Sequence, residues 1–289
     1  MRGFRLLGIL VVTGLLLGPL GTGFEAGSAE NDLADRVARL AGAYQAQMAV
    51  ADPSRELGLA LGLAGETWAE AGLKLADRFR NGQARDFIGV ARSKYQRDTA
   101  ASQEARNLQL SGLNFLYQSL NVLAFVLARQ NGETRTLESI KDTERRIMAV
   151  VGRSGPGGPA LAALSGGVLT MLAVVARQLD REGRMSQVLD DQLQLRREVD
   201  VNISERPDLA AETRILLLTN NHLHGAISMA QIAGLVQDPG LKTGLGRIEE
   251  ALLKTREADL EDQILAGAKA LAETGFLVAP TLVSVGVNP

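Results

Sequence analysis

Apolar residues along this chain recur mainly every three or four positions, in long intervals free of proline. Leu33, Val37 and Leu40 begin the first such interval, and their spacing places them on one face of a helix. Gly58 and Gly62 follow in the next interval and form a small-residue surface that another helix backbone can approach closely. The pattern predicts helices at about residues 32–50, 53–80, 84–130, 137–151, 160–176, 185–204, 209–238 and 241–272. We therefore expect an all-α protein, a bundle of about eight helices.

The clearest loop is Ser154-Gly-Pro-Gly-Gly-Pro159, because glycine and proline both disfavour a continuing helix. It separates an N-terminal helical half, residues 30–153, from a C-terminal helical half, residues 160–274. The sequence leaves open whether these are one bundle or two packed halves. The tail, residues 275–289, is apolar and uncharged. It is expected either to cover a groove as an extended segment or to contact a membrane or a partner.

A stripe of uncharged polar residues marks the segment 107–128, which contains no charged residue. Its members recur every three or four positions and are Asn107, Ser111, Asn114, Gln118 and Asn121. The stripe has three interpretations: a hydrogen-bonded network or uncharged surface, the lining of a small polar ligand site, or a water-filled path through a membrane. The preceding part of the same interval is charged, and residues such as Arg92 indicate a solvated face.

Both histidines of the chain lie in the segment Asn220-Asn-His-Leu-His224. On a helix, positions two apart diverge by about 200°, so the two rings cannot share one metal ion. No cysteine is present to complete a ligand set, and we expect no metal site. Asn220, His224 and Ser228 form a second polar row that we expect to face the stripe at 107–121, which predicts that the two helices are neighbours.

Catalytic motifs are absent from the sequence. Ser111 and Ser165 lie within predicted helices, without the strand-turn-helix context of a nucleophile elbow. The glycine-rich loop at 155–158 lacks the Lys-Ser/Thr of a P-loop and follows no strand. We therefore expect no enzyme activity and no cofactor.

The N-terminus has the features of an export signal. Arg2 and Arg5 precede an apolar run at residues 6–17, and Ala26-Gly-Ser-Ala29 is a small-residue cleavage site. This predicts a signal peptide at residues 1–29 and a periplasmic or extracellular protein, with a retained signal anchor as the alternative. The chain has no cysteine, so neither disulfides nor a thioether lipid anchor are expected.

Charge and aromatic content narrow the classes of ligand. Without residues 1–29 the net charge is −3, and no basic stripe is present to bind nucleic acid. Residues 126–275 contain no Phe, Tyr or Trp, so stacking on bases or sugars is not expected there.

Two short pieces of sequence suggest a family. The first piece comprises Leu40-Ala-Gly42, Gln45, Gln47-Met48 and Ala51-Asp-Pro53, before a Leu/Ala-rich helix. The second comprises Asn107-Leu108, Leu110-Ser-Gly112 and Gln118-Ser119. Together they resemble the exported helical nitrate/nitrite-sensor-like domain of type IV pili chemotaxis transducers, which implies a sensory role. Ala43 and Leu113 stand where that family has its first arginine, so the resemblance does not extend to anion binding.

The sequence thus predicts an exported, non-enzymatic helical bundle that binds a small polar ligand or an envelope protein partner. Its expected site residues are Asn107, Ser111, Asn114, Gln118, Asn121, Asn220 and His224. The alternative is a membrane-active protein that inserts residues 107–128 and 157–176. A third interpretation is a scaffold that forms homo-oligomers through glycine-rich helix faces.

Overall fold

The computed structural model describes residues 29–284 apart from 50–51, 102–103 and 156. The predicted signal peptide up to residue 28 and the end of the tail, residues 285–289, lie outside the described residues. The described chain forms ten α-helices and two short 3₁₀ helices and contains no strand, so the predicted all-α bundle is confirmed. The α-helices are α2 (Ala29–Met48), α3 (Pro53–Arg78), α4 (Gly82–Ala101), α5 (Ala105–Gln130), α6 (Thr134–Ser154), α7 (Gly158–Leu179), α8 (Ser186–Ser204), α9 (Ala211–Gln237), α10 (Lys242–Leu253) and α11 (Leu260–Val278), and the 3₁₀ helices are η1 (Pro239–Leu241) and η2 (Ala279–Ser284).

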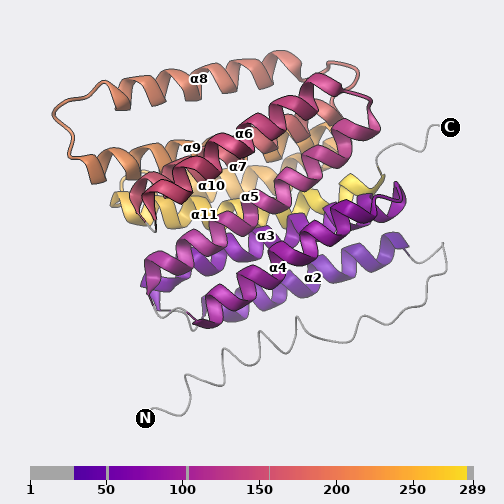
Figure 1. The fold of residues 1–289 in the computed structure, drawn as a ribbon, viewed down its shortest axis with the longest axis horizontal. Coiled ribbons are helices and arrows are strands. Elements are labelled where there is room, and N and C mark those ends of the chain that lie inside the picture. Colours follow the sequence, from indigo (N-terminus) through magenta and orange to yellow (C-terminus); the bar gives the residue numbers. More distant parts are fainter. Residues whose placement is uncertain (1–28, 50–51, 102–103, 156, 285–289) are drawn as a thin grey trace, which may run out of the picture.

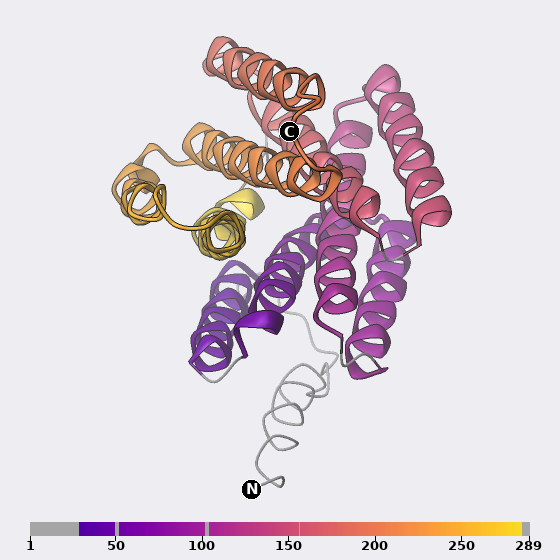
Figure 2. The same ribbon diagram turned by 90° about the vertical axis from the view of Figure 1, so that its left-hand side faces the viewer.

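Five helices form a closed inner ring. α3 packs on α5, α5 on α7, α7 on α9 and α9 on α11, and α11 packs back on α3. Each inner helix also packs against the outer helix that precedes it in the chain, which is α2, α4, α6, α8 or α10. The inner helices all run in one direction and the outer helices run back, as Figure 1 shows, and the five pairs surround the centre in the view of Figure 2. The fold is a ring of five helical hairpins.

The two helical halves predicted on either side of residues 154–159 belong to this one ring. They meet where α5 packs on α7 and again where α11 packs on α3. The Gly/Pro loop connects the outer helix α6 to the inner helix α7.

α3 and α5 cross closely at Gly58, Gly62 and Gly112. A Cβ atom added to Gly112 of α5 would lie 2.4 Å from the carbonyl oxygen of Gly58 and 3.0 Å from the backbone nitrogen of Gly62. The two backbones are therefore in direct contact, which only glycine permits. The close approach predicted at Gly58 and Gly62 is confirmed.

The uncharged segments 107–128 and 160–176 belong to the inner helices α5 and α7. Among the described residues, these two helices are long and apolar enough to cross a membrane by length and composition. In this fold 78% and 67% of their most apolar windows are buried. Packing against other helices thus accounts for their lack of charge.

Two predicted helices are in fact hairpins. The interval 84–130 forms α4 and α5, which pack on each other, and the interval 241–272 forms α10 and α11. A single straight helix over 84–130 would be about 70 Å long and would leave its apolar face without a partner. Folding back lets each half cover the other.

The tail is helical where it is described, and the expectation of an extended segment is wrong there. α11 continues to Val278 and η2 follows. Val278, Ala279 and Leu282 are buried, and η2 packs on α2, α3, α9 and α11. This part of the tail therefore belongs to the core.

Candidate ligand-binding groove

α5 is enclosed by its neighbours except along one stripe. From Gly112 to Ala124, the only residues of this helix that are not buried are Asn114 and Gln118. Their side chains, with those of Asn107 and Ser111, line a groove of about 820 Å³ between α4 and α6 that reaches the start of α7. The structure thus brings together four of the five residues of the predicted stripe. The fifth, Asn121, is buried and does not line the groove.

The floor of the groove on α5 is uncharged and mostly polar, with Leu110 as its apolar member. Asn107 Nδ2 donates a hydrogen bond to Glu104 Oε2 at 3.1 Å. Gln118 Oε1 is buried and has no hydrogen-bond partner in the described part of the chain. A buried carbonyl without a donor costs free energy, and rotation of this side chain toward the groove would let the atom accept from a ligand or from water.

The two walls of the groove are apolar. Phe87, Val90 and Ala91 line it from α4, and Met148 and Val151 line it from α6. Phe87 and Val90 are 44% and 67% exposed, which is high for apolar side chains of this size. An apolar surface next to a polar floor favours binding of a molecule that has both characters.

The charged residues at the rim neutralise one another. Lys94 and Asp98 line the groove and form an ion pair one helical turn apart. The other lining residues are uncharged. The groove therefore offers no unpaired charge to a ligand.

A buried ionic network holds α4, and with it one wall of the groove, against α3. Arg92 donates from Nε to Glu66 at 2.9 Å and from Nη2 to Glu70 at 2.8 Å, and Arg36 of α2 pairs with Glu70 at 2.8 Å. Burial raises the pKa of the Glu66 carboxyl above its usual value, although Arg92 lies beside it. The expectation from the sequence that Arg92 lies on a solvated face is therefore wrong. The signal that points to the network is the pair of acids Glu66 and Glu70, one turn apart, within residues 57–73 of α3, which contain no other charged residue.

An aromatic pair supports the groove next to this network. The rings of Tyr95 and Phe115 are stacked with centroids 4.9 Å apart, and they join α4 to α5. Burial, with the charge of Glu66 nearby, raises the pKa of the Tyr95 phenol, which is neutral near physiological pH. The wall on α4 thus has a fixed position relative to the floor.

The predicted contribution of α9 to this site is wrong. α7 lies between α5 and α9 in the ring, so the row at Asn220 and His224 does not face the stripe. Asn220 instead donates to Gln263 of α11 at 3.3 Å, and Ser228 donates to the carbonyl oxygen of His224. The sequence places these residues on a helix, but it does not determine which neighbour each helix face meets.

The other histidine joins three helices. Nδ1 of His222 lies 2.9 Å from Ser165 Oγ of α7, and Nε2 lies 3.0 Å from Asp200 Oδ2 of α8. Burial acts to raise the pKa of Asp200, but the hydrogen bonds from His222 and Asn221 outweigh it, so the pKa is lower than usual. The sequence alone does not connect these three positions, because they lie on different helices.

These residues are of the types found in a serine hydrolase triad, but their arrangement is not that of one. Ser165 is completely buried within α7, and its hydroxyl also donates to the carbonyl oxygen of Ala162 at 3.0 Å. A nucleophilic serine must be accessible to a substrate. Among these three residues, the carboxylate of Asp200 is instead the most exposed group. The geometry instead fixes the outer helix α8 against α7 and α9.

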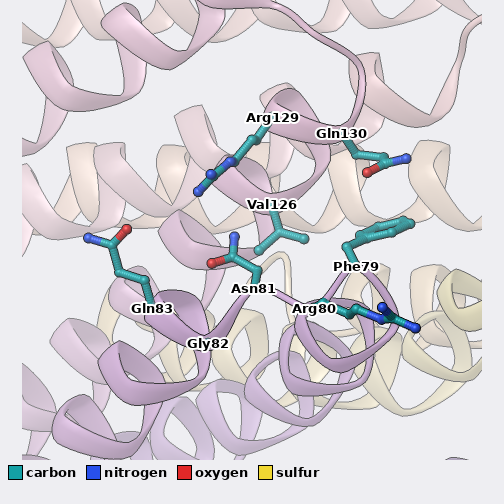
Figure 3. Close-up of a pocket in the computed structure, with 8 residues that line it drawn as sticks. All are labelled: Phe79, Arg80, Asn81, Gly82, Gln83, Val126, Arg129 and Gln130. Carbon is teal, nitrogen blue, oxygen red and sulfur yellow. The ribbon is translucent and has the colours of Figure 1, made fainter.

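Two smaller pockets lie at the other end of the ring, where the inner helices finish. One has a volume of about 340 Å³ and is lined by Arg80, Asn81, Gln83 and Arg129, among others. Figure 3 shows that Arg129 extends over Asn81 and Gln83, whereas Arg80 lies below Phe79 and points away. The two guanidinium groups therefore do not converge on one anion. The second pocket, of about 250 Å³, is lined by side chains of both charges, including Asp180 and Arg181.

Comparisons with protein family models, with curated proteins and with solved structures found no match. Within the residues that the structure describes, no three His, Cys, Asp or Glu side chains gather as a metal site. The geometry of the groove is thus the main guide to function.

Proposed function

We propose that this chain is an exported, non-enzymatic binding protein whose site is the groove over α5. The observation that carries the proposal is the placement of Asn114 and Gln118, which are the only half-buried residues between Gly112 and Ala124 of α5 and lie on the groove floor. A network that served only to fix helix register would satisfy its buried groups internally. Asn114 and Gln118 are instead half-buried and line the groove, which places their amides beside a bound ligand.

The groove is suited to an uncharged ligand with polar and apolar parts. Its volume of about 820 Å³ falls within the range of roughly 300–1,000 Å³ that is typical of ligand sites. The ligand is either a small polar molecule or part of an envelope protein. The predicted signal peptide supports a site outside the cytoplasm, and the sensory role implied by the family resemblance stays a prediction.

Thermal unfolding with a panel of uncharged solutes tests the proposal. Every described helix lies in residues 29–284, so a protein that starts at residue 29 retains the whole ring. The panel comprises capped dipeptides, N-acetylated sugars and cyclic amides. A solute at a hundred times its Kd stabilises the folded state by about 2.7 kcal/mol, which raises the Tm by roughly 5–11 °C for a chain of this size.

A double variant and a matched control locate the binding. Asn114→Leu with Gln118→Leu should abolish the rise in Tm, while Gln130→Leu should preserve it. Gln130 is an exposed amide on the same helix that lies outside the groove. A rise in Tm that survives the double variant, or that disappears equally in Gln130→Leu, would refute the assignment of the site.

A membrane-active protein is the second candidate function. It is favoured by the length and composition of α5 and α7, both of which could cross a bilayer if they left the ring. Liposome flotation with dye leakage measured in the same samples separates the two candidates. Flotation with leakage would favour insertion, whereas protein that stays unbound with the dye retained would favour the groove.

A further inference from the structure

The chemistry of the groove narrows the class of ligand. We propose that it binds an uncharged segment of a partner protein chain in an extended conformation. This inference rests on the proposed binding function and deepens it. Four features of the groove support it: the amides of the floor, the length of the stripe, the two apolar walls and the paired charges at the rim.

The floor matches the polar groups of a peptide backbone. Asn and Gln side chains each carry one amide, with the same carbonyl acceptor and N–H donors that a peptide unit presents. Asn107, Asn114 and Gln118 supply three such amides, and Ser111 adds a hydroxyl that can donate or accept. Gln118 Oε1 is closed to solvent and has no partner within the described chain, so it meets a backbone N–H only after its side chain rotates toward the groove.

The length of the floor sets the length of the segment. Asn107 and Gln118 are separated by eleven helical steps, or about 16 Å along the axis of α5. An extended chain rises about 3.3 Å per residue, so five or six residues cover the stripe.

The two walls match the alternation of side chains in an extended segment. Successive side chains point to opposite sides of an extended chain, while its N–H and C=O groups lie in the plane between them. A segment lying along the floor therefore directs one side chain toward Phe87 and Val90 on α4 and the next toward Met148 and Val151 on α6. Every second residue turns its backbone polar groups to the floor. Main-chain hydrogen bonds combined with apolar contacts of alternate side chains are a general mode of peptide recognition.

Other occupants match the groove less well. A helix is about 10–12 Å across, and its backbone groups already bond to each other, so they offer no free donor or acceptor to the amides of the floor. An acyl chain would contact the walls but has no donor or acceptor for the floor. A free oligopeptide brings a charged terminus at each end, whereas the charged groups that line the groove, Lys94 and Asp98, already pair with each other. An internal segment of a protein chain has no such charges.

Fluorescence polarisation with capped hexapeptides tests the proposal. The probes carry an acetylated N-terminus, an amidated C-terminus and a fluorophore, and they contain only Ala, Val, Leu, Phe, Ser and Gln. The protein starts at residue 29, and far-UV circular dichroism confirms that each variant is folded. We expect some members of this library to bind, and binding to be lost in Asn114→Leu with Gln118→Leu but retained in Gln130→Leu.

N-methylation of each peptide nitrogen in the best probe gives the decisive result. We expect a loss of affinity of about tenfold at every second residue and less than about twofold at the residues between, because only alternate N–H groups face the floor. Equal losses at all positions would indicate a helical ligand, and no loss at any position would indicate apolar contacts alone. Either outcome would overturn the proposal.

Two further outcomes separate this inference from the function on which it rests. If an uncharged solute binds in a manner that depends on Asn114 and Gln118 but no capped hexapeptide does, the groove is a binding site and the peptide inference is wrong. If neither solutes nor peptides depend on these residues, both proposals are wrong. Hexapeptides with free termini should bind at least about tenfold more weakly than capped ones, and equal or tighter binding would overturn the assignment to a protein segment in favour of a free oligopeptide.

Discussion

Replacement of Gly112 by alanine tests the packing beneath the groove. The added Cβ atom would lie 2.4 Å from the carbonyl oxygen of Gly58, 3.0 Å from the nitrogen of Gly62 and 3.2 Å from Cβ of Leu61. The two nearest of these atoms belong to the backbone of α3, so no side chain can rotate to make room for it. α3 and α5 must therefore move apart by up to about 1 Å at this point, which weakens the dispersion contacts along their interface.

The magnitude follows from two opposing effects. Overpacking of an interior commonly costs about 1–3 kcal/mol, and contact with two backbone atoms places this site near the upper end. Alanine in place of glycine within a helix returns about 1 kcal/mol. We therefore expect Gly112→Ala to lower the free energy of unfolding by about 2 kcal/mol. For a chain of this size that corresponds to a fall in Tm of roughly 4–8 °C.

Gly89→Ala is the matched control. Gly89 lies within α4 and is exposed. A Cβ atom added there would have no atom of another helix within 4 Å. The same substitution should therefore raise the free energy of unfolding there, by up to about 1 kcal/mol. Urea unfolding followed by far-UV circular dichroism measures both variants. If Gly112→Ala were as stable as the unchanged protein, or more so, the direct contact of the α3 and α5 backbones would be refuted.

Three other substitutions address the charged and polar groups. Arg92→Met should lower the free energy of unfolding by about 3–5 kcal/mol, because it leaves the buried carboxylates of Glu66 and Glu70 without their shared partner; a loss below about 1 kcal/mol in urea unfolding would contradict the buried network. Gln118→Leu should raise the free energy of unfolding by about 1 kcal/mol while weakening binding, because it removes a buried carbonyl that has no partner in the described chain; thermal unfolding measures the first effect, and a lower Tm would count against it. The pKa of Asp200 is lower in the folded protein than in the unfolded chain, so its contribution to stability is present above the unfolded pKa and is lost as pH falls through the folded pKa. The stability difference between the unchanged protein and Asp200→Asn should therefore shrink below about pH 4, and a difference that urea unfolding finds independent of pH would refute this linkage.

Hydrophobic periodicity predicts most helices of this protein because most of them bury one face against a neighbour. The helix ends near residues 80, 130 and 154 are predictable too, since Asn-Gly or a Gly/Pro loop follows each of them. The ends at Ala101 and Leu253 are not, because no glycine or proline lies between them and the next helix. At these two places the tertiary packing of hairpins, which local sequence does not encode, ends the helix.

The stripe on α5 is predictable for a related reason. Its polar residues share one face of a single helix, so the period of the sequence is enough to group Asn107, Ser111, Asn114 and Gln118. Sites that combine several helices need the order of helices around the ring. The pairing of His222 with Ser165 and Asp200, and the exclusion of His224 from the groove, depend on that order and do not follow from the sequence.

The closed ring has a consequence for the order in which the chain assembles. Neighbouring hairpins contact one another soon after both have formed, because few residues separate them. The contact between α3 and α11 joins opposite ends of the described chain, and Tyr44 of α2 meets Phe276 of α11 at the same place, with ring centroids 5.7 Å apart. Bringing such distant segments together carries the largest loop-closure entropy, so we expect this seam to form last during folding. Until α11 arrives, the face of α3 that it covers stays open to water, and a chain cut short before α11 would keep that apolar edge exposed.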